Sequence, residues 1–130
     1  MATSDYTRFV TKIAGVALTN YMYHFCIVDT DGEVNSGGTT LTAQGRVDGI
    51  VGEAVPVGMN FPMAIPDGGV AKVKCGDVVT AGQVLATAAD GRAIPRGASN
   101  GNLGWGVAME DGVADQIISM QFVNKGQINA

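Results

Sequence analysis

Turn signals built around glycine recur about every ten residues along this chain, and they constrain its fold more than any other feature. They are Asp31-Gly32, Gly37-Gly38, Asp48-Gly49, Asp67-Gly68-Gly69, Asp90-Gly91 and Asp111-Gly112. Gly and Asp reach the positive φ angles of tight reversals, and short apolar runs between such reversals are typical of sandwiches and barrels. The spacing predicts an all-β fold: a small single-domain β-barrel or sandwich of short strands with Gly-rich turns.

The segments between these turns are rich in Val, Ile, Phe and Tyr, which fit a pleated, half-buried surface. Strands are expected over Met22 to Val28, Gly49 to Val57, Phe61 to Ile65, Val70 to Lys74, Val84 to Thr87, Gly104 to Met109 and Asp115 to Val123. Pro56, Pro62 and Pro66 cannot donate to a strand ladder, so this region is expected to hold edge strands or strand ends.

One compact unit is the simplest organisation. The β domain is expected over residues 14–123, between an N-terminal arm (1–13) and a C-terminal tail (124–130), because both ends are polar enough to be mobile alone. The sequence has no evident repeat of fixed period and no linker long enough to separate two domains.

Charge and cysteine content exclude several classes of protein. Charged residues make up 15% of the chain, against a typical ~25%, so apolar area is expected to face outward and to mark a docking or oligomer contact. The net charge of −4, without a Lys or Arg run, argues against nucleic acid. No apolar stretch approaches a membrane span, no signal-peptide pattern is present, and Cys26 and Cys75 form no CxxC motif. We therefore expect synthesis in a cytoplasm with reduced thiols.

His24, the only histidine, precedes Cys26 by two residues, a spacing that places both on one face of a strand. Such a pair suggests a thiolate mechanism or a metal site. The same face carries Met22 and Val28, and the other face is equally apolar, so a buried strand with a hydrogen-bonded histidine and an inert thiol is the preferred interpretation. No catalytic residue, cofactor site or metal ligand is assigned, and the chain is not expected to be an enzyme.

The segment from Asp29 to Glu33 resembles the start of a calcium loop. The twelfth position of such a loop requires a bidentate carboxylate, and here it is Thr40. A hairpin reversal built by Asp and Gly is the better interpretation of this segment.

The order of the short motifs is more informative than any one of them. A strand ending in Asp29-Thr30-Asp31-Gly32 is followed by the runs Ile50 to Ala54, Gly69 to Lys74, Gly76 to Ala86, Asp90 to Ala93, Gly106 to Gly112 and Asp115 to Met120. In this succession, across residues 14 to 123, the chain resembles the capsid decoration or cement proteins of tailed bacteriophages.

The resemblance implies a structural virion protein that binds the outer surface of the expanded capsid. It would bridge subunits of the major capsid protein, its partner, and stabilise the head against internal DNA pressure. The protein would be made in the host cytoplasm and lie on the capsid exterior. A homo-oligomer is expected, with a trimer favoured by analogy with lambda-type decoration proteins.

Seven residues are candidates for the capsid or subunit interface. The N-terminal segment shows Tyr6, Arg8 and Val10 on one side and Phe9 on the other, and we hypothesise that it adds as a strand to a sheet edge of a capsid subunit or a neighbouring copy. The alternative is that it forms the first strand of its own domain or a loose end. Tyr21, Tyr23 and Trp105 are candidate aromatic anchors, although core packing explains them equally well.

A second class of function is a small ligand-binding or carbohydrate-binding β module. Such a site needs aromatic platforms and convergent polar groups. Aromatic residues are only 6% of the chain, which leaves Tyr21, Tyr23 and Trp105 as the main candidates for this role too.

Overall fold

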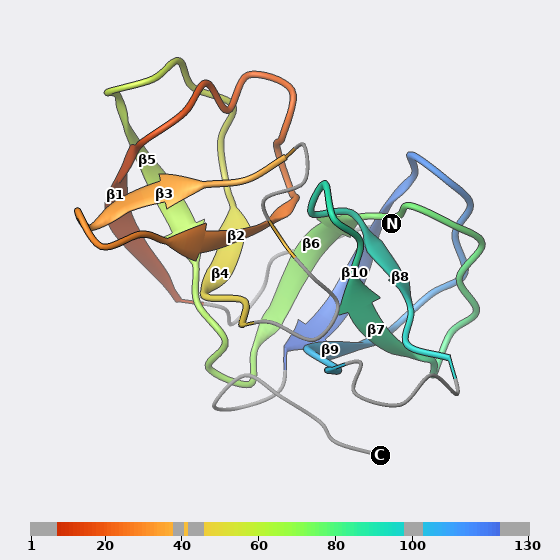
Figure 1. Ribbon diagram of the computed structural model, residues 1–130. Coiled ribbons are helices and arrows are strands. Elements are labelled where there is room, and N and C mark those ends of the chain that lie inside the picture. The colour runs from red at the N-terminus through yellow and green to blue at the C-terminus, as the bar shows by residue number, and fades with distance from the viewer. Residues whose placement is uncertain (1–7, 38–40, 42–45, 98–102, 123–130) are drawn as a thin grey trace.

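The computed structural model describes residues 8–37, 41, 46–97 and 103–122, and within these ranges it contains ten strands and no helix (Figure 1). The predicted all-β, single-domain fold is confirmed. No helix in the described part of the chain could cross a membrane. The strands are β1 Phe9–Ala14, β2 Phe25–Val28, β3 Glu33–Asn35, β4 Gly49–Val51, β5 Asn60–Ala64, β6 Val70–Lys74, β7 Val84–Thr87, β8 Ala93–Pro95, β9 Gly106–Ala108 and β10 Ile117–Phe122.

The strands divide into two groups of five that follow one another in the chain (Figure 1). In the N-terminal half (residues 8–65), the order β1-β3-β2-β4-β5 closes into a barrel, because β5 pairs again with β1. In the C-terminal half (residues 69–122), the order is β6-β10-β9-β7-β8. A parallel bridge between Cys75 and Ala93 joins the end of β6 to the start of β8, so this sheet also curls back on itself.

The two halves have the same topology. Numbered within its own half, the first strand lies between the third and the fifth, and the second lies between the third and the fourth. In both halves only the contact between the first and third strands is parallel. The registers also agree: Val28–Val34 corresponds to Thr87–Ala93, Val51–Met63 to Ala108–Met120, and Ala14–Val34 to Cys75–Ala93. The fold is therefore an internal duplication of a five-stranded unit.

Sequence inspection missed this duplication because few residue types are shared at equivalent positions. Those retained include Gly15 and Gly76, the Asp-Gly pairs of the two hairpin turns, and Met63 and Met120. The connection between the first two strands also differs in length, running over residues 15–24 in one half and 76–83 in the other. A search at a fixed period fails on such a change.

The duplicated units pack head to tail rather than face to face. One apolar cluster fills the N-terminal barrel, with Cys26, Val51 and Met63 among its members. Their strand neighbours point outward by the alternation of a strand, and these neighbours, Phe25, Ile50 and Ala64, join the cluster of the C-terminal half at 0–2% exposure. We call them the covered face.

The equivalent positions in the C-terminal half are Val84, Val107 and Gln121, which we call the open face. Val84 and Val107 are half-buried and Gln121 is exposed. The contact between the halves therefore uses this face of one unit and leaves the same face of the other unit partly exposed.

The N-terminal segment is part of the domain. β1 pairs antiparallel with β5 over Phe9 to Ile13 and parallel with β3 at Ile13 and Ala14. Of the two interpretations of this segment, the structure therefore has the first strand of its own domain, and the arm expected over residues 1–13 is wrong from residue 9 onward. Residues 1–7 and the tail from residue 124 lie outside the described residues.

Several strand bounds also differ from expectation. The strand expected from Met22 starts at Phe25 because Tyr23 has φ of 63°, which interrupts an extended chain. The strand expected from Gly49 to Val57 ends at Val51. β5 is not an edge strand, since it pairs with both β1 and β4. Pro62 fits within it because its missing N–H would face the position just beyond the end of β4, where the Pro62 carbonyl accepts a hydrogen bond from Gly52.

Candidate functional site

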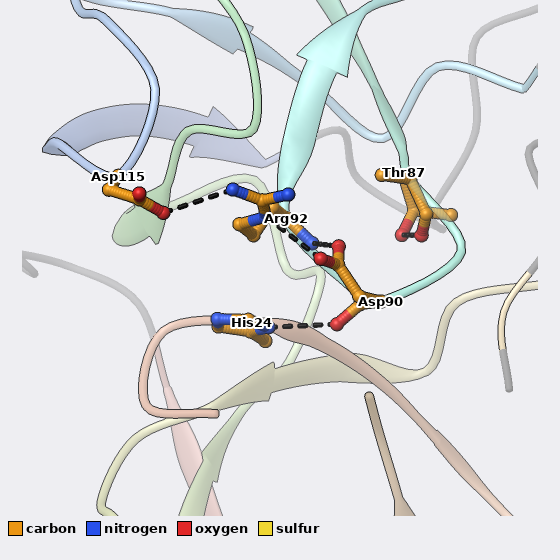
Figure 2. A network of polar contacts seen from close by, with 6 residues as sticks. His24, Thr87, Asp90, Arg92 and Asp115 are labelled. Carbon is orange, nitrogen blue, oxygen red and sulfur yellow. Dashed lines mark hydrogen bonds and ion pairs between the residues drawn. The ribbon is translucent and has the colours of Figure 1, made fainter. Parts of the chain in front are cut away.

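The β7–β8 turn, residues 88–92, is inserted against the N-terminal half, and we call it the docked turn. The backbone N–H of Phe25 donates to the Gly91 carbonyl at 2.7 Å, and that of Leu41 donates to the Ala89 carbonyl at 3.1 Å. The Nδ1 of His24 lies 2.8 Å from the Asp90 carbonyl oxygen (Figure 2). Three successive carbonyl groups of one half are thus held by the other half.

Gly91 is required at the tip of this turn. It is buried with φ of 92°, and a Cβ there would lie 2.6 Å from the Phe25 carbonyl oxygen and 2.8 Å from the Ser36 Oγ. Only glycine combines this backbone angle with such a close approach. Ser36 is itself fixed, since its hydroxyl donates to the Phe25 carbonyl at 2.7 Å.

His24 is 4% exposed, and its Nδ1 carries a proton and donates to the Asp90 carbonyl, because a carbonyl oxygen can only accept. Burial is the main cause that lowers the pKa of His24, with Lys74 and Arg92 adding to it, while the hydrogen bond and charge of Asp90 oppose it. The Tyr21 ring meets the imidazole edge-on at a centroid distance of 5.2 Å. The predicted buried, hydrogen-bonded histidine is confirmed.

Arg92 holds the docked turn in shape from its own side. Its Nε lies 2.9 Å from the Asp90 carboxylate, and its Nη1 lies 3.0 Å from that of Asp115, as Figure 2 shows. The hydrogen bond to Asp115 is the largest of the causes that raise the pKa of Arg92. Such partly exposed pairs contribute at most about 1 kcal/mol, so their role is mainly to fix the turn geometry.

The β2–β3 turn, residues 29–33, has the same backbone structure, but no such contact joins it to the other half among the described residues. We call it the free turn. Gly32 N–H donates to the Asp29 carbonyl at 3.0 Å, as Gly91 donates to Ala88 at 3.0 Å. Gly32 has φ of 80° and is exposed, and a Cβ there would meet none of the described atoms within 4 Å. The two turns differ in surroundings rather than in shape.

The carboxylates of the free turn gather at one point, since ligand atoms of Asp29, Asp31 and Glu33 lie within 4.8 Å of one another. The Asp29 oxygens already accept hydrogen bonds from the backbone of Asp31 and Glu33 and from the Asn35 amide, at 2.9 to 3.2 Å. These bonds build a hairpin reversal, in agreement with the preferred interpretation of this segment.

His24 and Cys26 do not form a joint site. His24 faces the docked turn, whereas Cys26 is fully buried in the N-terminal barrel. Burial raises the pKa of the Cys26 thiol far above its usual range, and burial also raises the pKa of the Cys75 thiol. Both groups are therefore neutral thiols at physiological pH, which makes them poor nucleophiles.

The candidate interface residues at the start of the chain are in different environments. Tyr6 lies outside the described residues. Arg8 is exposed, and its backbone N–H donates to the Asp67 carboxylate at 2.9 Å. Phe9 is 44% exposed at the start of β1, while Val10 packs against the barrel interior. Phe9 and Arg8 are thus available on the surface, and Val10 belongs to the core.

The aromatic candidates lie closer to the core. Tyr21 is half-buried with its ring against Gly37, and Tyr23 packs against the larger cluster, with Lys72 Nζ 5.5 Å from its ring centre. Trp105 is 4% exposed, so it cannot anchor a partner on the surface. Trp105 is therefore a core residue, as the alternative interpretation of the sequence allowed. Its Nε1 has no hydrogen-bond partner among the described residues.

Large apolar side chains are more exposed on the loops. Val57 and Met59 on the β4–β5 loop are 61% and 54% exposed. In the C-terminal half, Val78 and Val113 are 62% and 56% exposed and line a shallow hollow of about 250 Å³. Asp111 and Gln116 supply polar groups at its edge.

Asp90, Gly91 and Ser36 carry no signal in the sequence that marks them as contact residues. The Asp-Gly turns at residues 31–32 and 90–91 were recognised, yet nothing in the sequence distinguishes the docked one. The available signal was the recurrence of the same dipeptide after two similar strands.

The fold has a known counterpart. It is similar to the crystal structure of the head fiber gp8.5 N base in bacteriophage phi29, with a TM-score of 0.66 and 17% sequence identity. The alignment covers 94% of this chain and 99% of the other. No protein-family model matches the sequence, and no curated protein matches it either. The likeness is therefore one of fold.

Proposed function

We propose that this protein is a structural component of a phage head that binds the outer surface of the expanded capsid. There it stabilises the shell by bridging subunits of the major capsid protein, without enzymatic activity. The observation that carries the proposal is the fold similarity to a phage head fiber base, which extends over 94% of this chain.

The surface composition supports this role. Few charges and exposed Val57, Met59, Val78 and Val113 provide apolar area that a shell subunit could cover. Two like halves also present two sets of related loops, which suits a protein that must contact more than one subunit. Each contact can then be weak, because linked contacts reinforce one another.

The protein is also proposed to self-associate, and the resemblance to decoration proteins favours a trimer. The open face supports self-association, since Val84 and Val107 are only half-buried there. A ligand-binding or carbohydrate-binding β module is the second candidate. The hollow beside Val113 is the feature that favours it, although about 250 Å³ is small for a drug-sized ligand.

Co-sedimentation with undecorated heads of the phage that encodes this protein tests the proposal. Expanded heads should bind the purified protein saturably at a fixed ratio to shell subunits, and unexpanded proheads serve as the control. Decorated heads should also retain their DNA to a higher temperature. Binding to neither shell would contradict the proposal and leave the ligand-binding module as the leading candidate.

Charge placed on the apolar loops locates the contact. We expect Val57→Asp with Met59→Asp, or Val78→Asp with Val113→Asp, to weaken head binding, because a carboxylate opposes burial of the loop. Thr19→Asp, an exposed position in the connection between β1 and β2, is the matched control and should bind as the wild type does. Unchanged binding by both double variants would place the contact elsewhere.

A further inference from the structure

We propose that the free turn of one copy docks on the open face of a second copy, repeating between molecules the contact that joins the two halves. The inference specifies the interface of the proposed self-association and does not depend on capsid binding. It begins from the duplication: each half carries one turn and one face, and the fold uses only one of each.

The free turn can make the backbone contacts of the docked turn. Both turns share the hydrogen bonds that shape them, so the carbonyl groups of Asp31 and Gly32 correspond to those of Asp90 and Gly91. In the docked turn these two carbonyl groups are the acceptors for His24 and Phe25. In the free turn they lie at an exposed tip.

The open face carries a matching side-chain donor. Val84 pairs with Val107 as Phe25 pairs with Ile50, so Val84 occupies the position of Phe25. The Gln83 carbonyl accepts from the Ala108 N–H as the His24 carbonyl accepts from the Val51 N–H, so Gln83 occupies the position of His24. The Gln83 Oε1 accepts from the Thr80 N–H at 2.7 Å, which directs the opposite end of the amide, a donor, away from that bond. Gln83 can therefore donate to the Asp31 carbonyl as His24 donates to Asp90.

Apolar burial agrees with this pairing. A docked copy would cover Val84 and Val107, as the C-terminal half covers Phe25 and Ile50.

Such a contact is heterologous, because the turn and the face lie on different halves of the molecule. Copies joined in this way form a closed ring where the rotation permits and an open filament where it does not.

Sedimentation velocity over a concentration series of the full chain tests the interface. Gly32→Asn adds a side chain at a tip whose counterpart admits no Cβ, while Asn tolerates the positive φ. Gln83→Glu keeps the acceptor for Thr80 and removes the donor. Each variant should raise the Kd of self-association about tenfold or more.

Both variants have matched controls in this chain. Gly58 also has positive φ, at 84°, and a Cβ there would meet none of the described atoms within 4 Å, so Gly58→Asn repeats the first change elsewhere. Gln116 Oε1 accepts from the Val113 N–H as Gln83 does from Thr80, so Gln116→Glu repeats the second. Both controls should associate as the wild type does.

The outcomes separate two failures. Association of Gly32→Asn and Gln83→Glu with wild-type affinity would overturn this interface while leaving self-association intact. A wild-type chain that stays monomeric throughout the series would overturn self-association as well, whatever its binding to heads. Equal weakening by the test variants and their controls would also overturn the interface.

Discussion

The free turn and the docked turn have the same backbone structure and different roles. Both follow a second strand, contain Asp-Gly and place the glycine at positive φ, at 80° for Gly32 and 92° for Gly91. Only Gly91 touches the opposite half, where a Cβ has no room. The comparison shows that local sequence determines the shape of a turn, while its position in the duplicated fold determines what the shape is used for.

Alanine at the two glycines should give the largest difference. Gly91→Ala should lower the free energy of unfolding by about 3 kcal/mol, because unfavourable φ and steric overlap act together. Gly32→Ala should cost about 1 kcal/mol, from φ alone. Urea unfolding of both variants measures the effects, and equal losses would mean that the docked turn is not held as the structure indicates.

Acid should act on the docked turn through His24, whose pKa is lowered by burial. Above about pH 7 the histidine is neutral in both states, and it has no effect on stability. Below that, the unfolded chain binds a proton that the folded chain resists, so the free energy of unfolding falls by at most about 1.4 kcal/mol per pH unit. The loss should continue until the lowered, folded-state pKa is passed.

His24→Gln gives position 24 the same residue type as its counterpart in the C-terminal half, Gln83. The variant keeps a side-chain donor for the Asp90 carbonyl. Urea unfolding between pH 7 and 5 should show a smaller loss of stability for this variant than for the wild type. Parallel pH profiles would show that His24 is not the titrating group.

A smaller effect is expected where the halves differ in a turn residue. Asp115 has φ of 69° at the position equivalent to Gly58, whose φ is 84°. Asp115→Gly should stabilise and Gly58→Asp should destabilise the protein, each by up to about 1 kcal/mol. The free energies of unfolding are measured in about 0.5 M salt, which screens the exposed ion pair between Asp115 and Arg92. Changes of the same sign would contradict the equivalence of the two positions.

The local turn chemistry could be predicted from the sequence, because it depends on neighbouring residues. The reversals at Asp31-Gly32 and Asp90-Gly91 are both present. β3 and β8 were not expected because each has three residues and lies outside the longer apolar runs, and Pro95 ends the second of them. Strand ends were placed wrongly where one residue, such as Tyr23, adopts a φ that its type rarely takes.

The candidate site could not be predicted, because it depends on contacts between distant residues. His24 and Asp90 are 66 positions apart in the chain. Trp105 illustrates the same limit, since an indole suits a core and an interface equally well and only the fold decides. The duplication would have directed attention to the two turns, but its signal survives in backbone geometry and in very few residue types.

The order of the strands has a consequence for synthesis on the ribosome. All five strands of the N-terminal barrel lie within residues 9–64, so this barrel can close while the rest of the chain is still being translated. Phe25 and Ile50 then face water until the strands of the C-terminal half, which end at Phe122, have left the exit tunnel. At ~5–20 residues per second this interval lasts several seconds. Translation speed across the second half of the chain therefore determines how long each nascent molecule presents this apolar surface to water.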